Sequence, residues 1–317
     1  MIPDPLASQT RVAAAVATFN RRDVLRESLT ALLAQSRQLD EIIVIDNASS
    51  DGTAAMVAEE FPLVRLVQLA ENTGAAGGFA AGLEEGVSRG HDWVWVFNDD
   101  DFPQPETLAT MLDTAATLPP HTGLVGCARR DAAGKPYALG ARWRHRHMPV
   151  PRADPTGPPL ALDVITFSGT LVKSALVRQV GVPKRQFFMM IEDLDYCLRT
   201  RSAGWEIYVV PQPLVTSLTM GSEGKAPPWR GYYQTRNQLT MTLERRSGRE
   251  LAWWLIRTLR FCAGALRSGD RSGERIRLRM LGAWHAVRGV GGRTISPGSV
   301  DTAERLGPTA VVGGRNG

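Results

Sequence analysis

Residues 93–101 read Trp-Val-Trp-Val-Phe-Asn-Asp-Asp-Asp, so an apolar run ends in three consecutive carboxylates, Asp99, Asp100 and Asp101. If the run is a buried strand, it delivers the carboxylates together to one end of a sheet. Their mutual repulsion is then relieved only by protonation, by cationic neighbours or by a divalent metal ion. The alternative is a polar turn, because Asp-rich stretches often form turns and Pro103 follows closely.

The elements that would position these carboxylates can be recognised from hydrophobic patterning. Apolar segments of strand length alternate with segments of helical spacing. The strands are expected at 12–17, 41–45, 64–69 and 93–98, and the helices at 23–35, 53–61 and about 74–86. Strands that are apolar throughout and alternate with helices form parallel sheets covered on both faces. The sequence therefore predicts an α/β fold with a Rossmann-like, mostly parallel central sheet flanked by helices.

Polar clusters follow each of these strands. They lie at 18–21, 46–51, 72–78 and 99–101. In parallel sheets, ligands bind beyond the carboxyl ends of the strands. We therefore expect the four clusters to converge on one crevice.

The second half of the chain is less regular. Residues 129–162 are rich in Arg, Pro and Gly and predict a long surface connection with one hairpin. Strand character resumes over 163–172, and 192–199 has the acidic start and basic end of a helix. The segment 207–210 predicts a closing strand of the core, terminated by Pro211 and Pro213.

Composition limits the class of protein. A chain of 317 residues predicts one large core with an appendage. Three widely separated cysteines provide neither a disulfide framework nor a zinc-binding spacing, which indicates a reducing compartment. No charged leader precedes an apolar segment, and no apolar run approaches the roughly 20 residues that span a bilayer. These features predict a cytoplasmic protein, or one peripheral to the inner face of the cell membrane.

Taken in order, the motifs resemble those of the inverting GT-A glycosyltransferases of family 2, specifically the galactofuranosyltransferase and rhamnosyltransferase branch. The resemblance covers about residues 11–220. The matching motifs are Ala17-Thr-Phe-Asn-Arg21, Asp46-Asn-Ala-Ser-Ser-Asp-Gly-Thr53, Asn72-Thr-Gly-Ala-Ala-Gly-Gly-Phe79, Asp99–Asp101, and Glu192-Asp193 with Tyr196 and Arg199. Tyr232-Tyr-Gln-Thr-Arg-Asn237 resembles the start of the C-terminal helices of that branch.

The resemblance implies a metal-dependent hexosyltransferase. It implies Asp99 and Asp101 as ligands of Mn²⁺ or Mg²⁺, which suits a site built of oxygen ligands. It implies Asp193 as the general base that removes the acceptor proton, with Glu192 beside it holding an acceptor hydroxyl. The alternative for Glu192 and Asp193 is helix capping and compensation of the helix dipole.

The resemblance also implies a set of residues that contact the nucleotide sugar. They are Thr18, Asn20, Arg21, Asp46, Asn47, Asn72, Gly74, Gly78, Asp99 and Asp100. The two glycines are expected to let the backbone approach the ligand closely. Turn formation at 47–52 and helix packing of the glycines remain open as alternatives.

One position departs from the family pattern. Relatives commonly place a metal-binding histidine six residues after the proline that closes the last core strand, and counting from Pro211 gives Ser217. The metal then has carboxylate, phosphate and water ligands alone, or His145 or His147 reaches the site from the connection at 129–162. The basic run around these two histidines is more simply a solvated or phosphate-facing surface.

Charge divides the chain. Residues 1–120 carry 7 Lys/Arg and 18 Asp/Glu, whereas residues 226–291 carry 13 and 4. We therefore predict a GT-A domain over 1–225, a basic amphipathic helical region over 226–291 and a disordered tail over 292–317. The segment 251–266 is suited either to lying in an anionic membrane surface or to packing on the core. Nucleic acid is disfavoured as a partner because the acidic crevice would repel phosphates.

The expected reaction is transfer of galactofuranose from UDP-galactofuranose to a lipid-linked or growing glycan acceptor. Two alternatives remain open. One is a rhamnosyltransferase that uses dTDP-rhamnose. The other is a non-catalytic relic of the fold that binds a nucleotide or glycan, which the absent histidine suggests and the intact carboxylates argue against.

Overall fold

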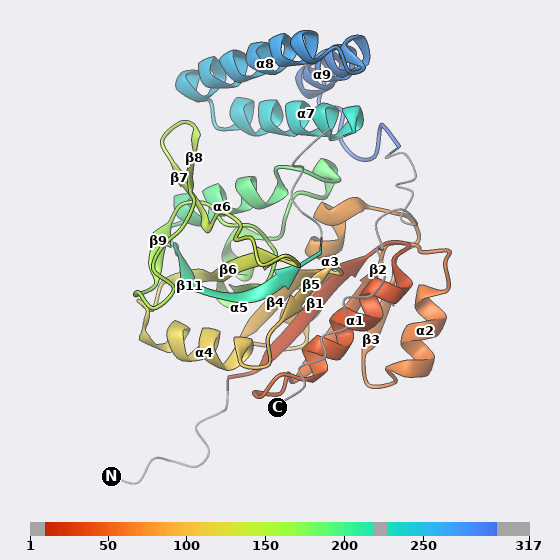
Figure 1. Ribbon diagram of the computed structural model, residues 1–317, viewed down its shortest axis with the longest axis vertical. Coiled ribbons are helices and arrows are strands. Elements are labelled where there is room, and N and C mark those ends of the chain that lie inside the picture. The colour runs from red at the N-terminus through yellow and green to blue at the C-terminus, as the bar shows by residue number, and fades with distance from the viewer. Residues whose placement is uncertain (1–9, 219–226, 297–317) are drawn as a thin grey trace.

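A computed structural model describes residues 10–218 and 227–296 of the chain (Figure 1). The strands are β1 (Val12–Thr18), β2 (Glu41–Asp46), β3 (Arg65–Gln68), β4 (Trp93–Asn98), β5 (Asp101–Pro103), β6 (Thr122–Asp131), β7 (Gly140–Trp143), β8 (His147–Val150), β9 (Leu160–Leu162), β10 (Thr170–Lys173) and β11 (Glu206–Ser217). The helices are α1 (Arg22–Leu33), α2 (Thr53–Glu60), α3 (Gly74–Ser88), α4 (Thr107–Thr117), α5 (Ser174–Val180), the short 3₁₀ helix η1 (Arg185–Phe187), α6 (Glu192–Ser202), α7 (Pro228–Glu244), α8 (Gly248–Ser268) and α9 (Ser272–Val287).

In this part of the chain, nine strands form one sheet in the order β3-β2-β1-β4-β10-β6-β11-β5, with β9 paired to β11. Strands β3, β2, β1 and β4 are parallel to one another, and β6 and β11 run in the same direction as these four. Strands β10, β5 and β9 run in the opposite direction. The predicted α/β class with a mostly parallel sheet is confirmed.

Helices cover both faces of the sheet because its central strands are apolar on both sides. Leu25 and Leu29 of α1 and Met111 of α4 pack with Val12, Val16 and Trp95 on one face. Phe79 of α3, Leu176 of α5 and Leu198 of α6 pack on the other face. The carboxyl ends of the parallel strands therefore emerge between two helical layers, as burial of an all-apolar strand requires.

The last strand differs from its prediction. We expected a strand over 207–210 ended by Pro211 and Pro213, but β11 continues to Ser217. Its pairing with β6 shifts register around Pro213, which accommodates residues that cannot donate a backbone hydrogen bond. Conversely, the strand expected over 163–172 forms only at β10, after Gly169 adopts a φ of +69°. The extension of β11 brings Ser217 opposite Asp101.

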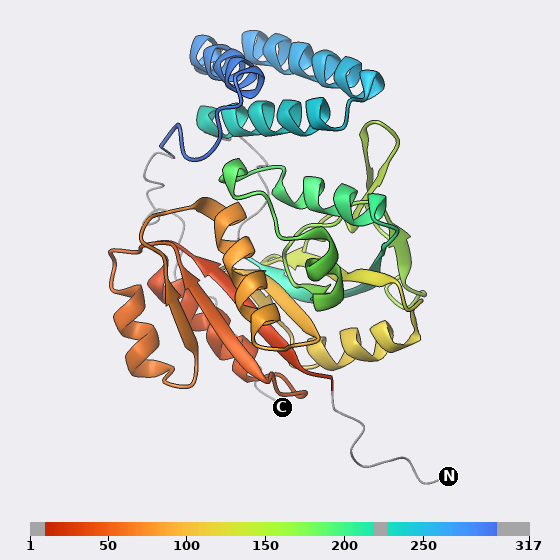
Figure 2. The same ribbon diagram turned by 180° about the vertical axis from the view of Figure 1, so that it is seen from behind.

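The connection at 129–162 contains the predicted hairpin, formed by β7 and β8. The C-terminal helices form a separate layer in which α7 lies nearest the sheet domain and α8 lies on its far side (Figures 1 and 2). Helix α8 contacts α7 and α9. Trp254 of α8 is buried against Leu239 of α7 and Ala286 of α9, so one face of α8 packs within the helical layer. No helix in the described ranges is both long enough and apolar enough to cross a membrane.

The first residues of the predicted tail are ordered, contrary to expectation. Residues 292–296 contact α7, where the Arg236 guanidinium donates to the Gly292 carbonyl at 2.8 Å and the Tyr233 hydroxyl donates to the Ile295 carbonyl at 2.6 Å. The rest of the predicted tail, 297–317, lies outside the described residues, as does the predicted boundary at 225. The division into a GT-A domain and a basic helical region remains a proposal.

Candidate active site

The three consecutive aspartates lie where the sequence predicts, beyond the end of β4 and at the start of β5. Asp99, Asp100 and Asp101 are 4%, 6% and 1% exposed. Buried carboxylates are stable only with compensating partners, and the neighbouring strand ends provide them. Because Ala17 of β1 pairs with Asn98 of β4, the residues that follow both strands meet at the same edge of the sheet.

Thr18 and Arg21 come from the β1 end and contact the first two aspartates. The Thr18 hydroxyl donates to Asp99 at 2.8 Å. One Arg21 nitrogen donates to Asp99 at 2.7 Å and to Asp100 at 3.0 Å. Burial raises the pKa of Asp99 to about 6, although the positive charge of Arg21 opposes the increase. The cluster therefore carries more negative charge than Arg21 alone balances.

Asp101 accepts from two serines that are distant in sequence, Ser168 in the bend before β10 and Ser217 at the end of β11. The hydroxyls of Ser168 and Ser217 both donate to its carboxylate, and the Asn98 amide donates at 3.1 Å. Arg129, at the end of β6, donates to Ser168 at 2.7 Å and to Ser217 at 3.3 Å. Burial raises the pKa of Asp101, and the charge of Arg129 opposes this increase.

The position at which relatives commonly carry a histidine is therefore beside Asp101, as the count from Pro211 indicated. Here Ser217 donates a hydrogen bond to the carboxylate. The expected alternative, a histidine from the long connection, is not supported by the geometry. His147 lies in β8 near Arg257 of α8, and His145 lies in the turn of the same hairpin.

The second pair of carboxylates starts α6. Glu192 and Asp193 are partly buried, and one oxygen of Glu192, Oε2, is shielded from solvent without a hydrogen-bond partner among the described residues. Burial raises the pKa of Glu192 to about 8, with the neighbouring charge of Asp193 adding to the increase. Burial also raises the pKa of Asp193, against the charge of Arg129.

Side-chain capping does not explain this pair, because the N-cap of α6 is Ile191 and no side chain caps the helix; Glu192 and Asp193 lie in its first turn, where they can compensate the helix dipole. The Leu194 amide donates to the carboxylate of its neighbour Asp193 at 2.7 Å. Glu192 gains no such bond for its buried oxygen. The charge of Arg129 opposes the raised pKa of both Asp101 and Asp193, so both carboxylates lie within electrostatic range of this arginine.

A strained chain reversal presents Glu192 and Asp193. Phe188, Met190 and Ile191 all have positive φ angles, between 61° and 75°. Such conformations are costly for residues other than glycine and persist only where the surroundings impose them. The Asn237 amide nitrogen donates to the carbonyls of Phe187, Met189 and Met190 at 2.8 to 2.9 Å.

Arg236 strengthens the same attachment between α7 and the reversal. Its guanidinium donates to the carbonyls of Gln186 and Phe187 at 3.1 and 3.0 Å. Both Arg236 and Asn237 are only 1% exposed. The motif at 232–237 thus fixes the segment from which the acidic pair extends.

The surroundings of the two glycines, Gly74 and Gly78, support the alternative of helix packing. A Cβ at Gly74 would lie 2.1 Å from the Phe188 carbonyl oxygen, and the φ of Gly74 is +71°. A Cβ at Gly78 would lie 2.7 Å from the Ala17 side chain. The space that each glycine provides is filled by protein atoms, so close packing of α3 explains their presence. Contact of either glycine with a nucleotide remains a prediction.

The remaining predicted nucleotide-binding residues lie at the ends of β1, β2 and β3. One oxygen of the fully buried Asp46 accepts from the Ser49 amide, and the other has no partner in the described ranges. The Asn47 side chain accepts from the Thr73 amide and hydroxyl. Asn20 accepts from the Ser50 amide, and Asn72 closes a local turn by accepting from Gly74. Only Asp46 retains an unused buried acceptor in this group.

Sequence reasoning missed Arg129, Ser168 and Arg230. Arg129 lies near the end of β6, and this position could have indicated a site residue. The sequence pattern instead placed Arg129 in a surface connection. Ser168 lies in a segment expected to be continuous strand. Arg230, whose charge opposes the raised pKa of Glu192, is separated from it in sequence by a strand and the undescribed residues 219–226.

The oxygen atoms of the aspartate cluster are of the type that binds a hard divalent cation. The cluster supplies carboxylate and hydroxyl oxygens, and burial raises the pKa values of Asp99 and Asp101, so a bound cation would stabilise their ionised forms. Among the described residues, no three His, Cys, Asp or Glu side chains are placed to hold an ion by themselves. An ion here would need further oxygens from a ligand or water.

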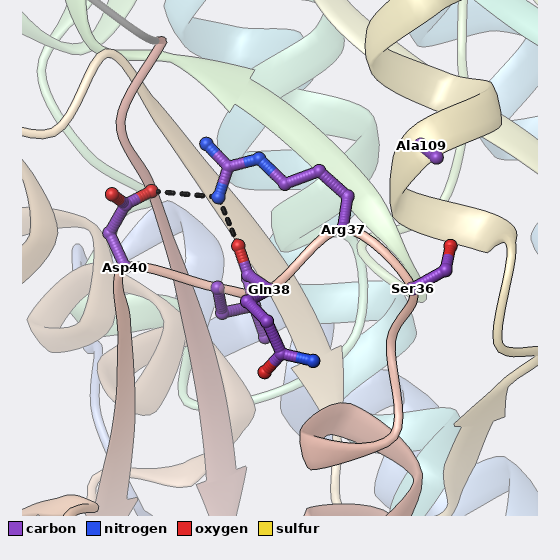
Figure 3. A pocket seen from close by; sticks show the side chains of 6 residues that line it. Ser36, Arg37, Gln38, Asp40 and Ala109 are labelled. Atoms are coloured by element: carbon purple, nitrogen blue, oxygen red, sulfur yellow. Dashed lines mark hydrogen bonds and ion pairs between the residues drawn. The ribbon is translucent and has the colours of Figure 1, made fainter.

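A separate cavity of about 590 Å³ lies at the opposite edge of the sheet (Figure 3). Ser36 to Asp40, which precede β2, line it together with Ala109 of α4. Arg37 donates to Asp40 at 3.1 Å within this cavity. Since the acidic clusters occupy the carboxyl ends of the strands, this cavity is separate from the candidate active site.

The fold and the crevice define a GT-A glycosyltransferase architecture, and solved structures agree. The mannosyltransferase PcManGT from Pyrobaculum calidifontis, in complex with GDP-Man and Mn²⁺, aligns with a TM-score of 0.56 at 18% identity over 89% of this chain and 88% of its own. S. aureus TarS 1-349 in complex with UDP aligns with a TM-score of 0.53 at 16% identity over 74% of this chain and 65% of its own. The predicted GT-A fold is confirmed.

The family described as glycosyltransferase like family 2 matches residues 9–242, and the chain belongs to it. Galactofuranosyltransferase GlfT1 of Mycolicibacterium smegmatis is 30% identical over 200 residues, 61% of this chain and 66% of that protein. The chain thus spans about two thirds of the length of this relative. The N-acetylglucosaminyl-diphospho-decaprenol L-rhamnosyltransferase of Mycobacterium tuberculosis is 27% identical over 266 residues, 75% of this chain and 84% of that protein.

The attachment of the chain reversal to α7 generates a prediction. Replacing Asn237 with aspartate removes three donated hydrogen bonds and places a carboxylate against three carbonyls. We expect the free energy of unfolding of Asn237→Asp to fall by at least about 3 kcal/mol, measured by urea denaturation. Gln234→Glu makes the same chemical change on a less buried position of α7 and should shift it by no more than about 0.5 kcal/mol. Equal stability of the two variants would contradict the proposed attachment.

Proposed function

We propose that this protein transfers a hexose, with inversion, from a nucleotide-diphosphate sugar to a lipid-linked or growing glycan. The donor that we favour is UDP-galactofuranose. The observation that supports the proposal is that two buried acidic groups from segments far apart in sequence, Asp101 and Asp193, both have a pKa that the charge of Arg129 lowers against burial. Inverting displacement requires an acidic donor side and a separate carboxylate that accepts the proton.

In the proposed reaction, an acceptor hydroxyl oxygen attacks the anomeric carbon of the donor sugar. The bond between that carbon and the diphosphate oxygen breaks, and the nucleoside diphosphate leaves with the electron pair. Asp193 takes the proton of the acceptor hydroxyl. Glu192, protonated at neutral pH because its pKa is about 8, holds that hydroxyl through a hydrogen bond. Attack opposite the leaving group inverts the anomeric centre.

The donor side is proposed to bind the nucleotide through the β1 and β2 ends. The unpartnered oxygen of Asp46 is suited to accept the imide N–H of uracil or thymine. Asp99 and Asp101 would hold Mn²⁺ or Mg²⁺, which supplies neutralisation of the departing diphosphate when bound. Support for the ion comes from the donor atoms and from PcManGT and GalNAc-T7, both solved with Mn²⁺.

The rhamnosyltransferase relative supports a second donor, dTDP-rhamnose, because its match extends over more of both chains. The imide group is common to uracil and thymine, so Asp46 alone does not separate the two donors. A position at the inner face of the cell membrane is also part of the proposal. Its support is that α8 exposes Leu255, Leu259 and Leu266, which are 51%, 60% and 65% exposed.

A donor screen tests the proposed function directly. Hydrolysis and transfer are measured with UDP-galactofuranose, dTDP-rhamnose and UDP-glucose, each with Mn²⁺, with Mg²⁺ and with EDTA. We expect UDP-galactofuranose to react fastest and EDTA to stop the reaction. A preference for dTDP-rhamnose would replace the favoured donor with the second one. Nucleotide binding without turnover of any donor would support the alternative that the protein is a non-catalytic relic of the fold.

The role of Asp193 gives a second test. Asp193→Asn keeps the size of the side chain but cannot accept the proton, so kcat should fall by about 10²- to 10⁴-fold. The affinity for UDP with Mn²⁺, measured by calorimetry, should stay within about twofold. Asp113→Asn, an exposed residue of α4, serves as the control of equal charge change. Normal turnover by Asp193→Asn would remove the assigned role of this residue.

The pH dependence of transfer tests the paired carboxylates. The rate should rise as Asp193 loses its proton, and it should fall above about pH 8, where Glu192 ionises beside it. Glu192→Gln cannot ionise and keeps a hydrogen-bond donor. We therefore expect the alkaline decrease in kcat/KM to disappear in this variant and to persist in Glu59→Gln, a surface control. An unchanged profile in Glu192→Gln would contradict the assignment.

A further inference from the structure

A second cavity, of about 480 Å³, lies between the chain reversal and the C-terminal helices. The residues that matter for its chemistry are Met190, Arg230, Arg260, Phe261, Arg275 and Arg279. Residues 260, 261, 264, 265 and 268 of α8 line it at spacings of three and four, so one face of that helix forms a wall. A Cβ at Gly264 would meet no atom within 4 Å, so this wall faces open space.

The cavity has an unusual charge composition. Four arginines line it against one carboxylate, that of Asp270, which already pairs with Arg275 at 3.0 Å. Within the described ranges, no carboxylate lies at ion-pairing distance from Arg230, Arg260 or Arg279. Arg230 and Arg279 are partly buried and Arg260 is exposed at the side of the cavity, and clustered guanidinium groups repel one another unless an anion is present. The cavity is therefore complementary to a group with more than one negative charge.

Burial of arginines at this cavity is consistent with a site for an anion. Burial lowers the pKa of Arg230 and of Arg279. Arg257, one helical turn before the lining segment of α8, has its pKa lowered to about 10 by burial and then by the charge of Arg279. A bound anion would reverse these effects.

The cavity lies near the carboxylates that are proposed to bind the acceptor. The Arg230 guanidinium lies 3.9 Å from the Met190 sulfur, and Glu192 follows Met190 by two residues. The donor side has its own arginines, Arg21 and Arg129, which contact the aspartates and the serines that hold them. An anion in the cavity would thus lie beside the proposed base and apart from the donor diphosphate.

The lining is also partly apolar, through Phe261, Met190, Pro227, Pro228 and Ala265. We propose that this cavity binds the phosphate or diphosphate group of an amphipathic acceptor, in which that group joins the accepting sugar to a hydrocarbon chain. This proposal rests on the proposed function for the identity of the acceptor side, but the binding event itself does not require turnover. The guanidinium groups would bind the phosphate oxygens through charge-assisted hydrogen bonds, and the apolar wall would contact the first carbons of the chain.

Farnesyl diphosphate is a suitable probe, because it combines both features without a sugar. Its binding to the full chain is measured by calorimetry with saturating UDP and Mn²⁺ present, so that the donor site is blocked. We expect Arg260→Gln/Arg279→Gln to weaken binding about tenfold or more, since two charge-assisted bonds are lost. Arg267→Gln/Arg277→Gln removes equal charge from exposed positions of α8 and α9 and should leave the affinity within about twofold.

A second variant guards against a folding defect in the first. Gly264→Phe fills the cavity, removes no charge and replaces a helix-disfavouring residue. It should weaken binding of farnesyl diphosphate while UDP binding stays intact. Undiminished binding of farnesyl diphosphate in both cavity variants would overturn the proposal.

Three comparisons identify the source of the anion. Inorganic pyrophosphate binding as tightly as farnesyl diphosphate would overturn the assignment to an amphipathic ligand. Binding to phosphatidylglycerol vesicles that depends on Arg260 and Arg279, without arginine-dependent binding of farnesyl diphosphate, would replace the acceptor with a bilayer headgroup. Arginine-dependent binding of farnesyl diphosphate together with failure of every donor in the screen would refute the proposed function and leave the cavity assignment standing.

Discussion

The chain reversal at Phe188–Ile191 is the constraint on which the arrangement of the crevice depends. Three of its four residues, Phe188, Met190 and Ile191, have positive φ angles that would relax if the chain were free. They are held from two sides. The Phe188 carbonyl accepts from the Ala76 amide at the start of α3, and Asn237 of α7 donates to the carbonyls around it. The position of Asp193 is therefore set by the sheet domain and by the helical layer together, so α7 is a structural part of the site.

Charge imposes the second constraint. Asp99, Asp101, Glu192 and Asp193 all have raised pKa values, in each case chiefly because burial disfavours the ionised form. Neutral hydroxyl donors stabilise Asp101 without adding positive charge. The positive charge of Arg129 opposes the raised pKa of both Asp101 and Asp193. A residue outside every family motif therefore contributes to the site.

The sequence predicted the first half of the fold well, because a parallel strand buried on both faces is a continuous apolar run. It placed Thr18, Arg21 and Asp99 at the same sheet edge for the same reason. It failed at β11, since Pro211 and Pro213 read as a stop but are absorbed by register shifts against β6. Local patterning cannot report such tertiary pairing. It also could not choose between the two roles left open for Gly74 and Gly78, because the atoms that fill their space, at Phe188 and Ala17, are distant in sequence.

The aspartate cluster and the cavity lined by α7, α8 and α9 carry opposite excess charge, and this difference bears on how each substrate would bind. On the donor side, the arginines are already engaged with carboxylates or with the serines that hold them, so a diphosphate there meets net negative charge and needs a cation. On the α7–α8–α9 side, Arg230, Arg260 and Arg279 have no carboxylate partner in the described chain, so an anion can bind them directly. Two phosphate-bearing substrates would thus bind at different places for one physical reason. A diphosphate that is bridged by a metal ion would bind at the aspartates, and a phosphate group without a metal ion would bind at the arginines.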